Sequence, residues 1–219
     1  MGSVSRFLLS EGTTKLGKAI LGWSIPAVHT CPGRSETCSR YCYATHGRFV
    51  TEKVKKLMEW RYEQSKRRDF CDRMVDEIYR RGVLVCRVHV SGDMATPRYT
   101  AKWIEIAARS SHVRFLCYSR SWRVEKIKPL LFAFGALPNV RLWLSADQET
   151  GYPPEVPEGC KVVWMQTTER ESVAGDLVFQ VRKLRRLALP MSIQVCPQES
   201  EEGKQKGVNC SNCGICWRE

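Results

Sequence analysis

The segment VLVCRVHVSGDMATPRYTAKWIEIAARSSHVRFLCYSRSW spans residues 83–122 and alternates apolar runs with a helix-like pattern. Residues 83–90 and 113–118 are short apolar runs of the kind that form buried strands. Residues 96–109, between them, repeat apolar side chains at helical spacing. A strand, a helix and a second strand in this order predict a crossover that places both strands parallel in one sheet.

The same alternation continues on both sides of this segment. About five or six strand–helix units fit into the chain, fewer than the eight units of a complete barrel of ~250 residues. The sequence therefore predicts an α/β fold, a partial (β/α)6-type barrel with parallel strands and a cysteine-rich C-terminal tail. Further helices are expected at residues 51–81, with a break near Asp69, and at 124–134, and further strands at 140–144, 161–165 and 192–196.

A chain of 219 residues with 43% apolar side chains can bury one substantial core, so we expect one domain. No internal repeat or low-complexity segment in the sequence calls for a second one. The predicted parts are an N-terminal segment with a first cysteine loop (1–50), a βα core (51–196) and the cysteine-rich tail (197–219).

Polar residues follow each predicted strand. Parallel strands present their carboxyl ends at one edge of a sheet, where α/β proteins bind ligands, so we expect a cofactor site there. The cofactor-binding candidates are Ser91, Gly92 and Asp93 after one strand and Ser145 and Asp147 after another. The same edge is predicted to carry Ser119, Arg120, Ser121, Gln166, Thr167 and Cys196.

Seven of the eleven cysteines fall into two groups near opposite ends of the sequence. The first group, Cys31, Cys38 and Cys42, lies in one short loop. Three thiolates can hold three irons of a [4Fe-4S] cluster and leave the fourth iron open to another ligand. Zinc is the alternative, because His29 and His46 are close enough in sequence to supply a fourth ligand.

The second group consists of Cys196 with Cys210, Cys213 and Cys216, the last three at the tight spacing of ferredoxin-type loops. Four thiolates would saturate a second [4Fe-4S] cluster, which would pass electrons to the first or fasten the tail across the sheet. A structural zinc ion fits the same four ligands. A third arrangement joins ligands from both ends in a single cluster, so one or two clusters remain possible.

The first cysteine loop, TCPGRSETCSRYCYA, resembles a variant of the radical SAM cluster loop, with Tyr41 before its third cysteine. Ser91, Gly92 and Asp93 stand where radical SAM enzymes carry a Gly-Gly-Glu motif that contacts the methionine end of S-adenosylmethionine (SAM). The resemblance implies a radical SAM-like fold, a cluster on Cys31, Cys38 and Cys42, and SAM near Ser91, Gly92 and Asp93.

A second resemblance covers most of the chain, through KLGKAILGWSIPAVHTCPG, VHVSGDMATPRYTAKWIEIA, FLCYSRSW, LWLSAD and CSNCGICW. In these segments the sequence is similar to the phage family of gene product eighty-eight. Members of that family share the cysteine loop, the Ser-Gly-Asp strand end and the cysteine-rich tail. This resemblance implies a bacteriophage protein that acts in the cytoplasm of the host cell.

The N-terminal residues lack the basic start and long apolar core of a secretory leader, and no run approaches the ~18 apolar residues of a membrane helix. We therefore expect a cytoplasmic protein without a membrane partner, whose thiols are reduced or bound to metal. The formal charge of +12 and the pI of about 9.3 favour polyanionic partners. Basic runs at 53–56, 66–68, 80–81 and 182–186 are either solvated faces or a phosphate-binding surface.

Three functions are compatible with these observations. The first is a radical SAM-like enzyme that modifies an unidentified substrate such as nucleic acid and needs an electron donor. The second is a non-enzymatic iron–sulfur protein that contacts nucleic acid or a host protein such as RNA polymerase. The third is a zinc-stabilised binding protein. The identity of the metal separates the third from the others, and SAM cleavage separates the first from the second.

Overall fold

A computed structural model describes residues 7–217 of the protein and contains one six-stranded sheet. All neighbouring strands are parallel, and their order in the sheet is their order in the sequence. In the described part of the chain β1 and β6 are the two edges and do not pair with each other, so the sheet is open. The strands are β1 (Leu21–Ser24), β2 (Val85–Ser91), β3 (Arg114–Ser119), β4 (Val140–Ala146), β5 (Lys161–Gln166) and β6 (Leu177–Gln180).

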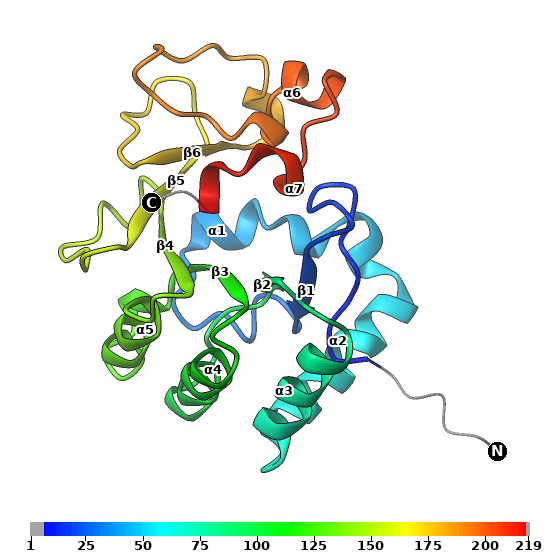
Figure 1. The fold of residues 1–219 in the computed structure, drawn as a ribbon. Helices are drawn as coiled ribbons and strands as arrows, with labels where there is room; N and C mark the ends of the chain where they lie inside the picture. Colours follow the sequence, from blue (N-terminus) through cyan, green and yellow to red (C-terminus); the bar gives the residue numbers. More distant parts are fainter. Residues whose placement is uncertain (1–6, 218–219) are drawn as a thin grey trace.

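Helices lie on the outer side of this sheet, where α3, α4 and α5 follow one another beside β2, β3 and β4 (Figure 1). The links from β4 to β5 and from β5 to β6 contain no helix among their described residues. The α-helices are α1 (Glu36–Arg40), α2 (Glu52–Lys66), α3 (Phe70–Arg80), α4 (Pro97–Arg109), α5 (Lys128–Gly135), α6 (Glu201–Gln205) and α7 (Cys210–Cys213). The 3-10 helices are η1 (Tyr43–Thr45), η2 (Gly47–Val50), η3 (Ser121–Arg123), η4 (Arg182–Leu184), η5 (Pro197–Glu199) and η6 (Ile215–Trp217).

The main core lies between the sheet and the outer helices. Phe70 of α3 and Trp103 of α4 are fully buried and pack against Trp23 of β1, with ring centroids 5.3 to 6.2 Å apart. Each fully buried aromatic side chain stabilises the fold by roughly 1.5–3 kcal/mol. This packing fixes the outer helices on the sheet, and it leaves the strand ends and the inner face of the sheet for other contacts.

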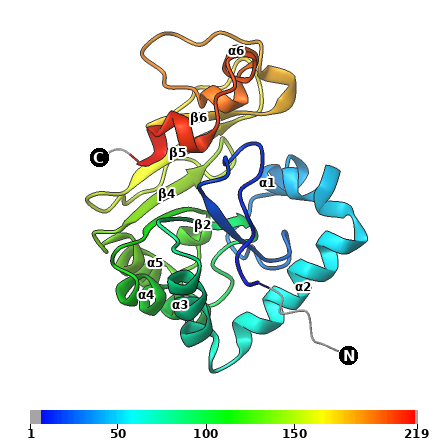
Figure 2. The same cartoon turned by 45° about the vertical axis from the view of Figure 1, so that its right-hand side comes forward.

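A second, smaller core covers the inner face. Leu116, Trp143, Val163 and Leu177 come from β3, β4, β5 and β6 and pack beneath the C-terminal segment, including Trp217. The view in Figure 2 shows this segment, drawn in red, beside β5 and β6. The tail is therefore part of the folded domain and covers apolar side chains of the sheet.

The structure confirms the α/β class and the parallel sheet, and it corrects the predicted strands at both edges. β1 was not predicted, because a run of four residues is too short for a clear pattern. The last strand is β6, and the predicted strand at 192–196 contributes only an isolated parallel bridge between Val195 and Val178. Apolar residues of 192–196 resemble a strand in sequence because they lie against β6. Among the described helices, none is long and apolar enough to cross a membrane.

β2 departs from regular strand geometry near its carboxyl end. His89 has a φ of 59°, in the left-handed region that few residues other than glycine occupy. The pairing with β1 shifts at this point, since Gly22 pairs with Arg87 whereas Ser24 pairs with Ser91. The irregularity is a bulge that directs the end of β2, including Gly92, towards the first cysteine loop.

Candidate metal and cofactor site

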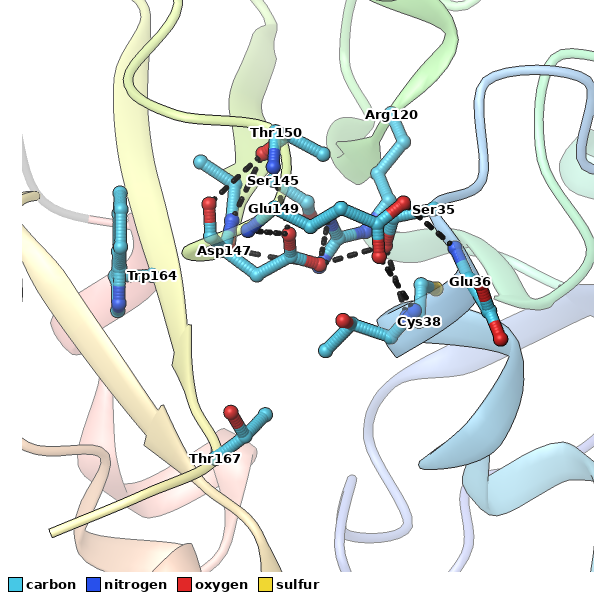
Figure 3. Close-up of polar contacts among 12 residues, drawn as sticks. Ser35, Glu36, Cys38, Arg120, Ser145, Asp147, Glu149, Thr150, Trp164 and Thr167 are labelled. Carbon is cyan, nitrogen blue, oxygen red and sulfur yellow. Dashed lines mark hydrogen bonds and ion pairs between the residues drawn. The ribbon is translucent and has the colours of Figure 1, made fainter. Parts of the chain in front are cut away.

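The first cysteine loop follows β1 and is fastened to the carboxyl ends of other strands. Ser35 caps the N-terminus of α1, and its hydroxyl accepts a hydrogen bond of 2.8 Å from the backbone N–H of Cys38. The same hydroxyl donates to the Asp147 carboxylate at 2.7 Å (Figure 3). The capping residue of the cysteine helix is therefore held by the residue that follows β4.

Asp147 is the centre of this attachment. Its carboxylate is fully buried and forms an ion pair of 2.6 Å with Arg120, which follows β3. The other carboxylate oxygen accepts backbone N–H groups of Glu149 and Thr150 at 3.1 and 3.0 Å. Asp147 thus joins the ends of β3 and β4 to the cysteine loop, and its hydrogen-bonding capacity is used by the protein.

Two further contacts hold the loop at this edge. The Glu149 carboxylate accepts the free backbone N–H groups of Glu36 and Thr37 at the start of α1, at 2.9 and 2.8 Å. These hydrogen bonds lower the pKa of Glu149. Gly33 lies so close to β3 that an added Cβ would come within 2.0 Å of the Arg120 carbonyl oxygen. The position of the loop therefore depends on the Glu149 carboxylate and on glycine, which has no side chain, at position 33.

Asp93, after β2, is engaged in the same way. Its carboxylate accepts the Ser119 hydroxyl at 2.6 Å and the backbone N–H groups of Met94 and Arg120 at 2.7 and 2.8 Å. Burial raises the pKa of Asp93, although the hydrogen bonds from Ser119 and Arg120 act in the opposite direction. The Asp93 side chain thus connects β2 to β3, as Asp147 connects β3 to β4.

The other predicted cofactor residues lie at the same edge. The Ser91 hydroxyl is buried and donates to the Ile25 carbonyl oxygen at 2.7 Å. Gly92 has a φ of 80°, and a Cβ there would lie 2.3 Å from the Ile25 side chain, so only glycine fits without strain. Ser145 is partly exposed, and its carbonyl oxygen accepts the Trp122 indole N–H at 2.9 Å.

Cys31, Cys38 and Cys42 are close enough for the charge of one thiolate to act on another. Burial raises the pKa of Cys31 to about 12, helped by the charge of Asp93 and by those of Cys38 and Cys42. Burial also raises the pKa of Cys38, and the positive charge of Arg120 opposes this shift. Thiols with raised pKa values bind a proton at neutral pH and release it when a metal replaces it.

The four tail cysteines line one pocket. Cys196 approaches it from the end of the loop that bridges to β6, and Cys210, Cys213 and Cys216 come from α7 and η6. Asn209 caps α7 through a reciprocal pair of hydrogen bonds with Asn212, and Gly214 ends it with a φ of 71°. This tight turn, with a glycine at the left-handed position, keeps the three tail thiols together.

The tail is clamped to the N-terminal segment. The backbone N–H groups of Cys210 and Ser211 donate to the carbonyl oxygens of Lys15 and Leu16 at 2.9 and 3.0 Å. Lys15 forms an ion pair with Glu199, which also binds Arg185. The red C-terminal helix and the dark blue N-terminal loop accordingly lie side by side in Figures 1 and 2. Contacts with the N-terminal segment thus hold the tail in place.

The charge of Arg87 on β2 acts on the same thiols. The Arg87 guanidinium lies 3.9 Å from the centre of the Tyr118 ring, and its buried Nε has no hydrogen-bond partner among the described residues. Burial raises the pKa values of Cys210 and Cys216, and the charge of Arg87 acts in the opposite direction on both. Trp143 donates its indole N–H to the Cys216 carbonyl oxygen at 3.1 Å.

All eleven cysteines lie within the described residues as free thiols. Across residues 7–217, no three His, Cys, Asp or Glu side chains are arranged as a metal-coordinating group. Cys71, Cys86 and Cys117 are buried in the core and Cys160 packs against it, in agreement with the sequence pattern.

Sequence reasoning did not find the residues that hold the two loops. Ser35 and Glu149 support the first loop, while Lys15 and Arg87 lie beside the tail. Serine is a preferred N-cap residue, and this is the one signal in the sequence that could have identified Ser35. The other three residues act through contacts between distant parts of the chain, for which the sequence carries no local pattern.

The chain is similar to known phage proteins along most of its length. Two curated relatives are each named "Gene 88 protein". The one from Mycobacterium phage D29 is 25% identical over 204 residues, which cover 85% of this chain and 78% of the relative. The one from Mycobacterium phage L5 is 24% identical over 203 residues, which cover 85% and 77%. No solved structure matches the chain. The family model described as "Gene product 88" matches residues 7–219, and the chain therefore belongs to the gene product 88 family.

Proposed function

We propose that this protein is an iron–sulfur phage protein with a radical SAM-like fold that acts in the host cytoplasm. The observation that carries the proposal is the pocket lined by Cys196, Cys210, Cys213 and Cys216. Four cysteine thiolates are a complete ligand set for a [4Fe-4S] cluster. Among the described residues these thiols are not yet arranged as a metal-coordinating group, so they would have to draw together around the cluster. These four residues would hold the tail cluster, which would carry one electron at a time between a donor and the rest of the site.

The first loop would hold a second cluster, which has three cysteine ligands instead of four. Cys31, Cys38 and Cys42 interact electrostatically, and each belongs to a loop fastened by Asp147. Three cysteines leave one iron without a protein thiolate, so a small molecule can complete its ligand shell. The role of the protein residues here is to hold three thiols at the strand ends and keep Cys38 next to Arg120.

The order of the motifs along the sheet supports the radical SAM resemblance and a partial (β/α)6-type barrel. The first cysteine loop follows β1, and Ser91, Gly92 and Asp93 follow β2 at the same edge. In an enzyme of this kind, SAM would bind between the loop and this strand end. Bound there, it would supply one-electron chemistry, while the chain orients the substrate and excludes water.

A binding protein without turnover is the second candidate, and the engagement of the strand-end carboxylates favours it. Asp93 and Asp147 direct their oxygens to protein donors instead of leaving them free for a cofactor. In this alternative the clusters stabilise a surface that contacts nucleic acid or a host protein such as RNA polymerase. The enzyme and the binding protein share the metal sites and differ in the response to SAM.

The first test is the content of iron, sulfide and zinc in protein purified without oxygen, followed by electron paramagnetic resonance after reduction, with and without SAM. Cys38→Ser should remove the first cluster, and Cys213→Ser should remove the tail cluster. Cys160→Ser is the matched control, because Cys160 is half-buried and packs against the core.

The iron proposal requires that iron per chain falls in both ligand variants and stays at the wild-type value in the control. A signal that SAM changes supports the enzyme, and an iron signal indifferent to SAM supports the binding protein. Zinc without iron in the wild-type protein would overturn both and leave a zinc-stabilised binding protein.

A further inference from the structure

Two cations from distant segments lie beside one aromatic ring at the rim of the sheet, with further cations on the neighbouring elements, and the cysteine chemistry does not account for them. We define the rim patch as Arg40, Tyr41, Arg182, Lys183 and Lys204. It joins the end of α1, the 3-10 helix η4 after β6, and α6, segments that are far apart in the sequence. The four cations are exposed, and Tyr41 is partly exposed.

The geometry of the rim patch centres on Tyr41. The Lys183 ammonium nitrogen and the Arg40 guanidinium carbon each lie 5.8 Å from the centre of the Tyr41 ring. Cations at this distance are attracted to the π-face of the ring. Two segments separated by more than half of the sequence thus place their positive charges beside one aromatic side chain.

The positive charge of the rim patch is only partly compensated by carboxylates, of which Glu199 acts on Lys204. The pKa of Lys204 is lowered by partial burial and by the positive charges of Arg185 and Arg182, among others. The nearby Glu199 is engaged by Lys15 and Arg185. Among the described ion pairs, none includes a cation of the rim patch. Its positive charge is therefore available to an external anion.

The surface of α2 gives a useful contrast. There Lys56 pairs with Glu52 at 3.1 Å and Lys66 with Glu63 at 2.5 Å, both within one helix. Acidic neighbours on the same helix are a common way to make a solvated basic face electrically neutral. The rim patch has the opposite organisation, since its cations gather from several segments.

The position of the rim patch ties it to the first cysteine loop. Arg40 is the last residue of α1, which contains Cys38, and Tyr41 immediately precedes Cys42. A ligand bound to the rim patch would therefore lie next to the thiols of the first loop. This position suits a substrate or a regulated partner of that site.

We propose that the rim patch binds single-stranded nucleic acid, with its cations on successive phosphates and Tyr41 stacked on a base. Cations that follow a backbone, combined with an aromatic platform, are the usual elements of sequence-tolerant single-strand binding. The inference rests on the proposed function in one respect, because it names the substrate or partner class of that same site. The binding itself does not require a particular metal.

The test measures binding of a fluorescent single-stranded DNA or RNA oligonucleotide to the full chain by anisotropy over a range of salt concentrations. The patch variant replaces Arg182, Lys183 and Lys204 with Gln. The matched control replaces Lys53, Lys55 and Lys56 with Gln, which removes the same charge from exposed positions of α2. Each cation that contacts a phosphate of a single strand contributes about 0.7 to the slope of log affinity against log salt. The patch variant should lose about 2 from this slope, and the control should keep the wild-type slope.

Tyr41→Ala provides a second measurement, because a generic charge effect does not involve an aromatic ring. Loss of base stacking should weaken binding roughly 5- to 100-fold, and Tyr41→Phe should restore it. Equal slopes in the patch and control variants would overturn the proposal. Binding of polyglutamate as tight as that of the oligonucleotide, with no effect of Tyr41→Ala, would also overturn it and indicate an acidic protein partner.

Metal analysis on the same samples separates this inference from the proposed function. Patch variants should keep the wild-type metal content, because they leave every cysteine in place. Oligonucleotide binding by a wild-type protein that contains no iron would contradict the iron–sulfur proposal and leave the rim patch intact. Iron in a protein that does not bind the oligonucleotide at low salt would reject the rim patch and leave the cluster proposal intact.

Discussion

His89 is a buried, uncharged histidine in the core of the sheet. Its Nε2 lies 2.8 Å from the Tyr99 hydroxyl, which accepts the Trp23 indole N–H at 2.7 Å. With the Trp23 bond in place, the hydroxyl still has its own proton to donate to Nε2, an arrangement in which a neutral His89 carries its proton on Nδ1. Burial, together with the charge of Arg87, lowers the pKa of His89 to about 3.

Because of His89, we expect the free energy of unfolding to be smaller in acid. Between the usual histidine pKa of 6.5 and the folded value of about 3, the unfolded chain binds a proton that the folded chain does not. The free energy of unfolding should therefore fall as the pH drops through this window, by up to about 1.4 kcal/mol per pH unit. Chemical denaturation at pH 7, 6 and 5 measures the slope.

The control for this prediction is His89→Asn. Asparagine tolerates the left-handed backbone conformation of this position and does not titrate. The variant should lose the part of the pH slope that belongs to His89, although it will be less stable at pH 7. The same slope in the variant and the wild-type protein would assign the acid sensitivity to other groups.

Arg87 predicts an electrostatic effect on the tail site. If the proposed tail cluster is bound, the positive charge of Arg87 stabilises its more negative, reduced state, so Arg87→Gln should shift the reduction potential of the cluster to a more negative value. A redox titration followed by electron paramagnetic resonance measures the shift. Arg114→Gln is the control, because Arg114 is exposed at the start of β3. A potential that changes in neither variant would show that Arg87 serves packing against Tyr118 alone.

At the level of single elements, the attachment of α1 to the sheet depends on Asp147. Asp147→Asn leaves the buried Arg120 guanidinium without its charged partner and weakens the acceptor of the Ser35 hydroxyl. Breaking a buried ion pair costs about 3–5 kcal/mol. We expect a loss of stability of this size, measured by urea denaturation, and a lower metal content of the first loop.

The control for Asp147 is Glu149→Gln. Glu149 is exposed and receives two backbone N–H groups of α1, of which an amide side chain can still accept one or both through its oxygen. The cost should stay below about 1 kcal/mol, as for other single exposed contacts. Similar losses in the two variants would show that the buried pair has no special part in holding the loop.

The strands and helices of the central part of the chain could be predicted because each has a strong local pattern. Residues 83–90, 113–118, 140–144 and 161–165 are β2, β3, β4 and β5 to within two residues at either end. β1 and β6 have four residues each, and their strand character depends on pairing with a neighbour. The whole fold determines which strands pair with each other, so the sequence of a short segment alone does not show whether that segment forms a strand.

The candidate site, too, could be predicted only where the sequence has a local pattern. The sequence predicted that Asp93 and Asp147 lie at one edge, and the structure places both there. The sequence did not predict that hydrogen-bond donors of the protein occupy the oxygens of both carboxylates. The donors to Asp93 come from the end of the neighbouring strand, and Ser35, which donates to Asp147, lies more than a hundred residues away in the sequence. Cysteine spacing identified the two thiol groups, while their supports, such as Lys15 for the tail, became visible only in three dimensions.

In the whole molecule, the C-terminal tail closes over the inner face of the sheet. The tail thiols and Trp217 cover the inner face of β3–β6, and Cys210 is hydrogen-bonded to the N-terminal segment. Metal bound by the four tail cysteines would stabilise this closed arrangement, because a ligand that binds only the folded form shifts the equilibrium towards it. Removal of the metal should therefore loosen the tail before the rest of the domain.

Limited trypsin digestion measures this loosening, since Lys204 and Lys206 are exposed within the tail. Treatment with a chelator should accelerate cleavage there by about tenfold or more, while cleavage in α3 and α4 stays slow. Gly17→Ala should have a similar effect with the metal present, because a Cβ at this position would lie 2.2 Å from the Ser211 hydroxyl oxygen. Equal cleavage rates with and without metal would show that the tail is held by its protein contacts alone.

The sequential order of the strands has a consequence for synthesis on the ribosome. Each strand pairs with the one made just before it, so the sheet can grow one strand at a time while translation continues. The contact between Ser211 and Leu16 spans 195 positions and can form only near the end of this process. During that interval the inner face and the thiols of the nascent chain are exposed together. For the iron–sulfur protein proposed above, delivery of metal at this late stage would compete with oxidation and aggregation, and the yield of intact protein should then depend on how quickly the metal is supplied.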